Sequence, residues 1–337
     1  MQKVMMAGLE VSRMCFGTLT MGPLQKGMTV DEGADLLVYA FSKGVNFFDT
    51  AELYGTYPHM AEAIRRIRSA SGEAFAGLGD PVISTKSYAY DAEGARNAVE
   101  RARREMDIDV IDVMMLHEQE TKLTMEGHRE ALEFYLDQKS RGVIRAVGVS
   151  THAIEVVKAC AQMPEIDIIH PIVNYLGVGI IDAKGSTPRA EQMREAVALA
   201  QNAGKGVFAM KPLGGGNLAK TYDDCMKYVL GNEHIQSIAI GMQTQDEIDM
   251  NLAIFDGVPV PVDLRARCVK DRRSLHVADW CQGCGNCIKS CQFKALRIAT
   301  RGNSKDVPLG HVTVDQKRCT TCGYCSRRCP VFALKIY

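Results

Sequence analysis

Short apolar runs rich in β-branched residues alternate with segments of helical period along most of the chain. Eight such runs occur, and each is followed by a segment with the apolar spacing of a helix. The predicted strands are Met14–Met21, Val45–Thr50, Val82–Lys86, Asp112–His117, Ala146–Ser150, Ile169–Tyr175, Val207–Leu213 and Ser237–Met242. Runs such as IDVMML indicate strands that are buried on both faces, as in a parallel sheet. Eight strand and helix units predict an α/β chain with a (β/α)8 TIM barrel, a fold of about 250 residues.

Two further signals agree with a closed barrel. Hydroxyl side chains that can cap free helix amides mark helix starts at Thr29, Thr124 and Thr244. No GxGxxG motif follows the first predicted strand, which argues against an open, doubly wound dinucleotide-binding sheet.

The pattern changes at GVPVPVD, a turn-rich stretch that ends the repeated units. We predict a boundary near Val262, with the barrel in residues 1–262 and a small α+β domain in residues 263–337. The second part holds nine of the twelve cysteines and reads as two similar halves. Each half is a cysteine run followed by a short apolar segment, KALRIAT in the first and FALKIY in the second.

The two cysteine runs share the spacing C-x2-C-x2-C-x3-C, and Pro330 follows the second run directly. This is the pattern of bacterial ferredoxins with two [4Fe-4S] clusters, in which the fourth cysteine of each run binds the other run's cluster. The predicted ligand sets are therefore Cys281, Cys284, Cys287 and Cys329 for one cluster, and Cys319, Cys322, Cys325 and Cys291 for the other.

Glycines and the remaining cysteines refine this prediction. Gly283, Gly285 and Gly323 permit the turns that aim amide donors at sulfur. Two structural zinc sites are the alternative, but zinc ligands usually come as two separated pairs and not as an evenly spaced run closed by Cys-Pro. The cysteines outside the runs are expected to be small buried apolar residues: Cys15, Cys160, Cys225 and Cys268.

Charge and hydropathy exclude several classes of partner. Forty basic residues balance forty acidic ones, so no overall field attracts nucleic acid or anionic lipid. The N-terminus lacks a signal-peptide apolar run, and no stretch approaches the roughly 20 apolar residues of a membrane span. We therefore expect a cytoplasmic protein with neither a nucleic-acid nor a membrane partner, in which the cysteines bind metal and do not form disulfides.

Ionisable residues follow three consecutive predicted strands, at the barrel end where TIM-barrel chemistry takes place. Asp49 and Tyr54 lie in NFFDTAELYG, Lys86 ends ISTK and His117 ends MMLH. Each residue alone has an ordinary explanation as a helix cap, a solvated strand end or a core histidine. Together and in this order they resemble the aldo-keto reductase superfamily, and the resemblance covers the predicted barrel. They form our candidate catalytic set.

The resemblance implies carbonyl and alcohol chemistry with NAD(P)H. Tyr54 is the expected general acid or base, Lys86 held by Asp49 is expected to stabilise its phenolate, and His117 to orient the carbonyl oxygen. The residues that match the family's cofactor positions are Ser150, Thr151, Asn174, Lys211, Leu213, Gly214, Gly215, Gly216, Gly241, Met242, Thr244 and Asn251. Relatives commonly carry glutamine at the position of His170 and a basic residue at that of Gln243, so the choice between NADP and NAD stays open.

Clusters pass single electrons, whereas a nicotinamide exchanges two as a hydride, and a flavin is the usual adapter between them. Three classes of function follow. The first is an NAD(P)-linked reductase whose clusters relay electrons to or from a ferredoxin, flavodoxin or other redox protein. The second is a ferredoxin-linked reductase without nicotinamide, and the third is a non-catalytic electron-transfer subunit. A structural role for the clusters is a further alternative.

The substrate is expected to be a small carbonyl compound or alcohol, whose identity depends on loop shapes. EQETKL after the fourth strand and residues 177–188 are expected to line its site.

Overall fold

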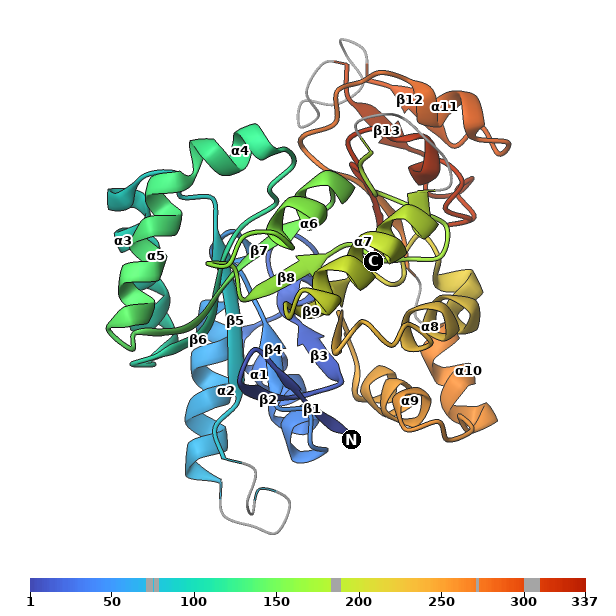
Figure 1. Cartoon of the computed structure of the whole chain (residues 1–337). Helices are drawn as coiled ribbons and strands as arrows, with labels where there is room; N and C mark the ends of the chain where they lie inside the picture. Colours follow the sequence, from blue (N-terminus) through green and yellow to red (C-terminus); the bar gives the residue numbers. More distant parts are fainter. Residues whose placement is uncertain (71–74, 76–78, 183–188, 271–272, 300–309) are drawn as a thin grey trace.

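The computed structural model describes residues 1–70, 75, 79–182, 189–270, 273–299 and 310–337 (Figure 1). Eight parallel strands close into a barrel in the order β10-β3-β4-β5-β6-β7-β8-β9. Their bounds are β3 Met14–Gly17, β4 Phe47–Asp49, β5 Val82–Ser87, β6 Ile111–Leu116, β7 Ile144–Thr151, β8 Ile168–Pro171, β9 Gly206–Met210 and β10 Ser237–Ile240. The predicted barrel and its eight strands are confirmed. The first, sixth and seventh strands end several residues earlier than predicted, because their last predicted residues leave the sheet, those of the first strand as the short 3-10 helix η1 (Thr18–Thr20).

Helices follow every barrel strand and cover the outside of the barrel (Figure 1). They are α1 Val30–Ser42, α2 Tyr57–Ser69, α3 Ala92–Met106, α4 Lys122–Gly127, α5 Arg129–Ser140, α6 Ile154–Cys160, α7 Arg189–Asn202, α8 Tyr222–Leu230, α9 Gln245–Phe255 and α10 Val262–Lys270. Thr29 and Thr244 cap α1 and α9 as predicted. The prediction for Thr124 is wrong, because Thr121 is the N-cap of α4 and Thr124 completes its capping box from the third position.

A hairpin that the sequence pattern did not reveal closes one end of the barrel. Strands β1 (Lys3–Met6) and β2 (Leu9–Ser12) pair antiparallel. Met6, Leu9 and Val11 of this hairpin join the apolar side chains of the barrel interior, among them Phe47 and Phe208. The strands' N-terminal end is thereby plugged, so the opposite end, where the polar strand ends gather, is the end available for chemistry.

Helix α10 packs against α9 although it begins at the predicted boundary. Arg267 of α10 forms ion pairs with Asp246, and Arg265 pairs with Asp223 at the start of α8. These contacts favour counting α10 with the barrel. The boundary near Val262 stays a prediction.

The C-terminal part is built from two small antiparallel pairs, β11 (Leu275–Val277) with β14 (Leu334–Ile336) and β12 (Leu296–Ile298) with β13 (Val312–Val314). Strands β12 and β14 fall on the two apolar segments KALRIAT and FALKIY. The helix α11 (Asn286–Ser290) and the short turn η5 (Ser326–Arg328) lie within the two cysteine runs. This arrangement is the small α+β domain that the repeated halves predicted.

Three of the four cysteines outside the runs are fully buried, as expected: Cys15, Cys160 and Cys225. Cys268 on α10 departs from this expectation because it is only partly buried. Among the described residues, no helix is long and apolar enough to cross a membrane.

Candidate functional site

The centre of the candidate site is a buried ion pair between neighbouring strands. Asp49 ends β4 and Lys86 lies in β5, and the Lys86 ammonium donates hydrogen bonds to both Asp49 carboxylate oxygens at 2.8 and 2.7 Å. Its third hydrogen bond is to the Thr50 carbonyl at 2.8 Å. Both side chains are buried, so each charge depends on the other for compensation.

His170 also belongs to this centre, although the resemblance singled it out only as a departure. It lies in β8 with its Nε2 3.7 Å from an Asp49 oxygen, and its Nδ1 pairs with the Phe208 carbonyl at 2.7 Å. Burial alone raises the pKa of Asp49, but Lys86 and His170 outweigh it and hold that pKa well below its usual range. Asp49 is therefore a fixed negative charge. The sequence signal that could have assigned His170 to the site is its position as a polar residue at the end of the sixth barrel strand.

Tyr54 and His117 stand beside the ion pair, as predicted. The Lys86 ammonium lies 4.9 Å from the centre of the Tyr54 ring, over its face. The Tyr54 and His117 rings meet edge to face, with centroids 5.7 Å apart. The structure thus brings the four predicted catalytic residues together at the open end of the barrel.

The stabilisation of the Tyr54 phenolate by Lys86 stays a prediction, and the surroundings of Tyr54 favour the phenol. Burial and the negative charge of Asp49 raise the pKa of Tyr54 well above its usual value. Lys86 does not offset this, because its hydrogen bonds go to Asp49 and Thr50 and it faces the ring. Tyr54 is consequently held as a phenol at neutral pH, with a proton to donate.

His117 is a neutral side chain in this setting. Burial, with a smaller contribution from Lys86, lowers the pKa of His117 to about 3. Its ring stacks on Tyr88 at a centroid distance of 4.3 Å. Its Nδ1 is buried and has no hydrogen-bond partner among the described residues, and the same holds for Oε1 of the nearby Gln119. Unpartnered buried polar atoms at the barrel mouth are groups that a bound substrate can satisfy.

A second charged group, which the sequence analysis did not assemble, surrounds Glu118. Tyr88 donates to Glu118 at 2.5 Å, and Lys211 and His152 each lie 3.7 Å from its other oxygen. Lys211 and His152 share a hydrogen bond of 2.7 Å. Burial raises the pKa of Glu118, but Lys211 and His152 bring it below its usual range. Of this group, Lys211 was predicted as a cofactor residue and Glu118, in EQETKL, as part of the loop that lines the substrate site.

The residues expected at the nicotinamide end of the cofactor form hydrogen bonds with other residues of the chain. Ser150 and Thr151 end β7, where the Ser150 hydroxyl accepts from the Glu118 amide at 2.8 Å and the Thr151 hydroxyl donates to the Gln119 carbonyl at 2.5 Å. The Asn174 amide closes its own loop through two bonds to Val178. Of residues 177–188, expected to line the substrate site, 183–188 lie outside the described part of the chain.

The residues expected at the adenosine end also have structural partners. Gly241 and Met242 follow β10 against Thr20, and Thr244 caps α9. Asn251 is buried between Tyr222 and the carbonyl of Glu247. The side-chain nitrogen of Gln243 is buried without a partner among the described residues.

The glycine loop expected over the pyrophosphate contacts the chain's own C-terminal strand. Leu213 and Gly214 close the turn after Lys211, and the Ile336 amide of β14 donates to the Gly215 carbonyl at 3.0 Å. A Cβ on Gly216 would lie 1.8 Å from the Ile336 carbonyl oxygen, so only glycine fits there. The Asn217 amide adds a bond to the Leu334 carbonyl at 2.9 Å.

Phe332 brings the cysteine-rich domain into the barrel mouth. It is 5% exposed and belongs to the main apolar cluster of the barrel. The Lys211 ammonium lies 5.4 Å from its ring centroid, and the His152 ring meets it edge to face at 6.0 Å. Glu118, Lys211 and Phe332 all have positive φ angles of 48°, 56° and 48°. Such left-handed non-glycine residues are uncommon and gather at functional sites.

The contacts of the glycine loop within the chain bear on the expected nicotinamide cofactor. Strand β14 contacts Gly215 and Gly216, the glycines whose backbone amides would approach a bound pyrophosphate. The family's cofactor positions therefore stay a prediction for this chain.

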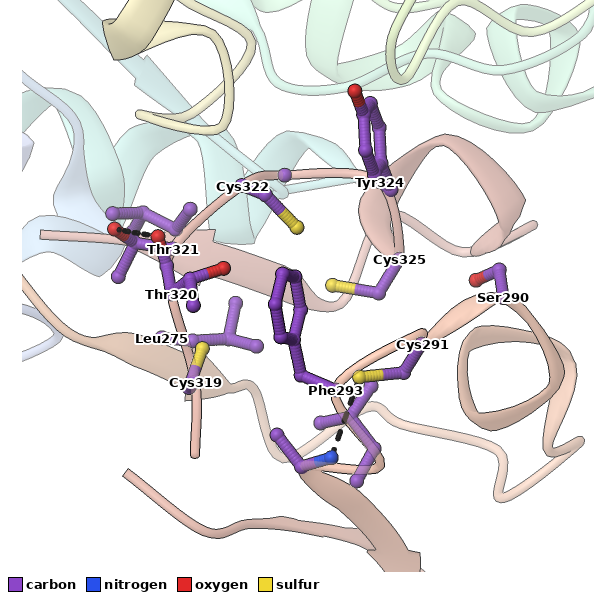
Figure 2. A pocket seen from close by; sticks show the side chains of 14 residues that line it. Leu275, Ser290, Cys291, Phe293, Cys319, Thr320, Thr321, Cys322, Tyr324 and Cys325 are labelled. Carbon is purple, nitrogen blue, oxygen red and sulfur yellow. Dashed lines mark hydrogen bonds between the residues drawn. The ribbon is translucent and has the colours of Figure 1, made fainter. Parts of the chain in front are cut away.

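The structure brings the four cysteines of one predicted set around a single cavity, and the ligand sets themselves stay a prediction. Cys291, Cys319, Cys322 and Cys325 line one cavity, and Figure 2 shows their sulfur atoms around it. In the other set, burial raises the pKa of Cys287 to about 11, and the neighbouring thiols of Cys329 and Cys281 add to this rise. Cys284 is exposed at the edge of the domain.

The donor arrangement fits a cluster better than a single ion. Among the described residues, no three metal-binding side chains converge closely enough for one ion. A cluster instead takes one thiolate at each iron corner, so its ligands stay apart. The backbone amides of Ala295 and Ala333 donate to the sulfurs of Cys291 and Cys329 at 3.4 and 3.2 Å, a pairing repeated in both halves. Gly283, Gly285 and Gly323 make left-handed turns as predicted.

Comparison with known proteins supports both parts. The family model for the aldo/keto reductase family matches residues 13–249, and the model for a 4Fe-4S dicluster domain matches residues 280–333. A probable aldo-keto reductase 1 from Glycine max is 25% identical over 62% of this chain and 58% of its own length. An L-galactose dehydrogenase from Arabidopsis thaliana is 19% identical over 73% of this chain and 85% of its own. The chain thus spans less than two thirds of the first of these relatives.

Solved structures agree on the fold. An aldo-keto reductase from Bacillus halodurans in its holo form superposes with a TM-score of 0.59 at 18% identity, covering 80% of this chain and 96% of its own. A Bombyx mori aldo-keto reductase in complex with NADP has a TM-score of 0.56 at 16% identity, covering 79% and 91%. With its barrel matched over more than half its length, this chain belongs to the aldo/keto reductase family and carries a 4Fe-4S dicluster domain at its C-terminal side.

Proposed function

We propose that the protein interconverts a small carbonyl compound and its alcohol at Tyr54, and that two [4Fe-4S] clusters supply or accept the electrons. The observation that carries this proposal is the position of Phe332. It comes three residues after the cluster ligand Cys329, and it lies on Lys211 and His152 at the same barrel mouth as Tyr54 and His117.

The barrel residues have separate tasks in this reaction. Neutral His117 holds the carbonyl oxygen through its unpartnered nitrogen, and Tyr54 delivers a proton to that oxygen. The buried pair of Asp49 and Lys86 fixes the Tyr54 ring by the ammonium on its face. In the direction of oxidation, Tyr54 accepts the proton of the alcohol.

The electron count matches two clusters. Reduction of a carbonyl to an alcohol consumes two electrons and two protons. Each cluster, when bound, stores one electron at a time. Two clusters would therefore supply the two electrons that one carbonyl group needs. Tyr54 provides the proton to oxygen, and water provides the one that reaches carbon. A reduced one-electron carrier protein replenishes the clusters and is itself oxidised in two single steps.

NAD(P)H-dependent carbonyl reduction is the second candidate. It is supported by membership of the aldo/keto reductase family, by a solved family member in complex with NADP, and by the unpartnered nitrogen of Gln243 near the expected adenosine end. This candidate requires strand β14 to leave the glycine loop, because Ile336 lies against Gly215 and Gly216.

The test begins with anaerobic protein analysed for iron, sulfide, flavin and nicotinamide. The clusters are photoreduced with a deazaflavin, and their reoxidation is followed by absorbance with a panel of small aldehydes and ketones. We expect one of these compounds to reoxidise the clusters without nucleotide. Tyr54→Phe should slow this by about 10²- to 10⁴-fold, the usual contribution of general acid catalysis.

Three results contradict the proposal. Equal reoxidation rates in the wild type and Tyr54→Phe remove Tyr54 from the reaction. Clusters that resist photoreduction, in protein with a full iron content, indicate a structural role. Turnover that depends on added NADH or NADPH, with cluster bleaching on titration, establishes the second candidate in place of the first.

A further inference from the structure

The two parts of the chain carry opposite charge, which the balanced total conceals. Residues 273–337 contain eleven lysines and arginines against three aspartates, and no glutamate. The first 272 residues have 29 basic and 37 acidic residues. The cysteine-rich domain is therefore a basic body on an acidic barrel, and its surface can attract a partner of negative charge.

An open hollow in this basic surface lies beside the cavity of the second cysteine set. Ser290, Gln292, Tyr324, Arg327 and Arg328 line it. Its lining is continuous with the cluster ligands, because Gln292 follows Cys291 and Tyr324 precedes Cys325 in the chain. In Figure 2 the Tyr324 side chain points away from the four sulfur atoms. The hollow thus lies next to the expected position of the cluster, which shortens the path of an electron.

Among the described residues, no carboxylate compensates the positive charge in the hollow. Arg327 and Arg328 are exposed, and no carboxylate among the described residues lies within ion-pair distance of either. The Arg327 guanidinium instead lies over the Tyr324 ring, 5.1 Å from its centroid. Adjacent arginines on the barrel behave differently, because Arg65 and Arg66 are both paired with Glu62.

Large aromatic side chains are exposed beside predicted ligands of both clusters. Trp280, the single tryptophan of the chain, is 54% exposed and precedes Cys281. Phe293 is 45% and Tyr324 49% exposed, close to Cys291 and Cys325. Exposed tyrosine and arginine side chains that share one hollow have the composition of protein-binding hot spots.

We propose that this hollow is the docking site of a small acidic one-electron carrier protein. The carrier meets Arg327 and Arg328 with its carboxylates and covers Tyr324. It passes one electron to the cluster held by Cys291, Cys319, Cys322 and Cys325. The carrier is oxidised by one electron, the cluster is reduced by one, and no bond or proton changes place. A contact of this kind is small and transient, as is typical of redox encounters. The proposal rests on the proposed function in requiring redox-active clusters.

The experiment uses the full chain with its clusters and a photoreduced acidic flavodoxin as the probe. Stopped-flow absorbance gives the rate of cluster reduction over a series of salt concentrations. The test variant is Arg327→Gln/Arg328→Gln, and the matched control Arg104→Gln/Arg141→Gln removes two charges from the barrel surface. We expect the test variant to be about tenfold slower at low salt and equal to the wild type at high salt. The control should follow the wild type throughout.

Two further measurements separate docking from damage to the cluster. Iron content and the rate of reduction by a neutral deazaflavin radical must be unchanged in the test variant, because Arg328 adjoins Cys329. Gln292→Glu adds a negative charge to the hollow without altering the arginines, and it should slow the flavodoxin reaction but not the deazaflavin reaction. If Arg327→Gln/Arg328→Gln fails to assemble clusters, Gln292→Glu tests the docking site in its place.

Several outcomes overturn the docking site. If deazaflavin reduces the wild-type clusters but flavodoxin does not, the docking site is wrong and the proposed function survives. If neither reduces them, the electron relay fails as well. Equal flavodoxin rates in the wild type, the test variant and Gln292→Glu also reject the site. Binding of single-stranded DNA that is tighter than flavodoxin binding, and lost in the test variant, assigns the surface to nucleic acid.

Discussion

The candidate site of the barrel and that of the cysteine-rich domain differ in what holds their side chains in place. In the barrel, Asp49 and Lys86 compensate each other inside a closed ring of apolar strands and covering helices. In the small domain, the apolar cluster has seven buried residues, two of which are the predicted ligands Cys287 and Cys325. A core of this size gives little stability by itself. The barrel site is held by protein groups alone, whereas the small core of the second domain predicts that its stability depends on bound clusters.

The largest expected effect comes from removing a cluster ligand. Cys325→Ala removes a predicted ligand, and we expect the loss of one cluster, about four of about eight irons. The small domain should also become less stable, because a bound metal group supplies much of the folding energy of such a domain. Iron analysis and limited proteolysis measure this. Cys160→Ala, which alters a buried cysteine outside the runs, is the control and should keep its iron. A variant Cys325→Ala with full iron content would contradict the ligand assignment.

The next effect belongs to the barrel. Asp49→Asn leaves the Lys86 ammonium buried without a counter-charge and should reduce the free energy of unfolding by about 3–5 kcal/mol. Urea denaturation measures it. Asp49→Asn/Lys86→Met should recover part of the loss, because no unpaired charge remains. The exposed pair of Arg129 and Glu133 is the control, and Glu133→Gln should change stability by less than about 1 kcal/mol. A small effect of Asp49→Asn would show that water reaches Lys86.

Acid should destabilise the barrel through His117. Its pKa is about 3 in the folded protein and roughly 6.5 in an unfolded chain, so between these values only the unfolded state takes up the proton. The stability present above the unfolded pKa is therefore lost as pH falls, by about 3 kcal/mol between roughly pH 7 and pH 4. Urea denaturation at both pH values should show a weaker pH dependence for His117→Gln. His128→Gln, at the junction of α4 and α5, should keep the wild-type dependence. Equal dependence in all three proteins rejects a neutral buried His117.

The smallest expected effect concerns the contact between the two regions. Asn217→Ala removes buried hydrogen bonds to the Gly214 and Leu334 carbonyls and should weaken the attachment of β14 by about 1–2 kcal/mol. Calorimetry should show the transition of the small domain moving to a lower temperature. Asn97→Ala on the exposed face of α3 is the control. A single unchanged transition in Asn217→Ala would mean that the two regions unfold as one unit.

Much of both regions could be predicted because their signals are local. The eight apolar runs, the cysteine spacing and the polar strand ends are each read within a few residues. The helix start at Thr124 was misplaced because Thr121 offers the same hydroxyl three residues earlier. The hairpin of β1 and β2 escaped because its plugging of the barrel depends on contacts with distant strands, such as Phe47 and Phe208.

The sequence by itself determined the barrel and the cysteine-rich domain, since strand period and cysteine spacing are properties of neighbouring residues. It also predicted the four residues Asp49, Tyr54, Lys86 and His117 and the two cysteine sets. Only the tertiary structure decided that burial and Asp49 raise the pKa of Tyr54 and that β14 lies on the glycine loop. It also placed Phe332 at the barrel mouth and left Arg327 and Arg328 without carboxylate partners among the described residues. Burial and charge compensation depend on side chains that are distant along the chain, and folding alone sets which of them meet.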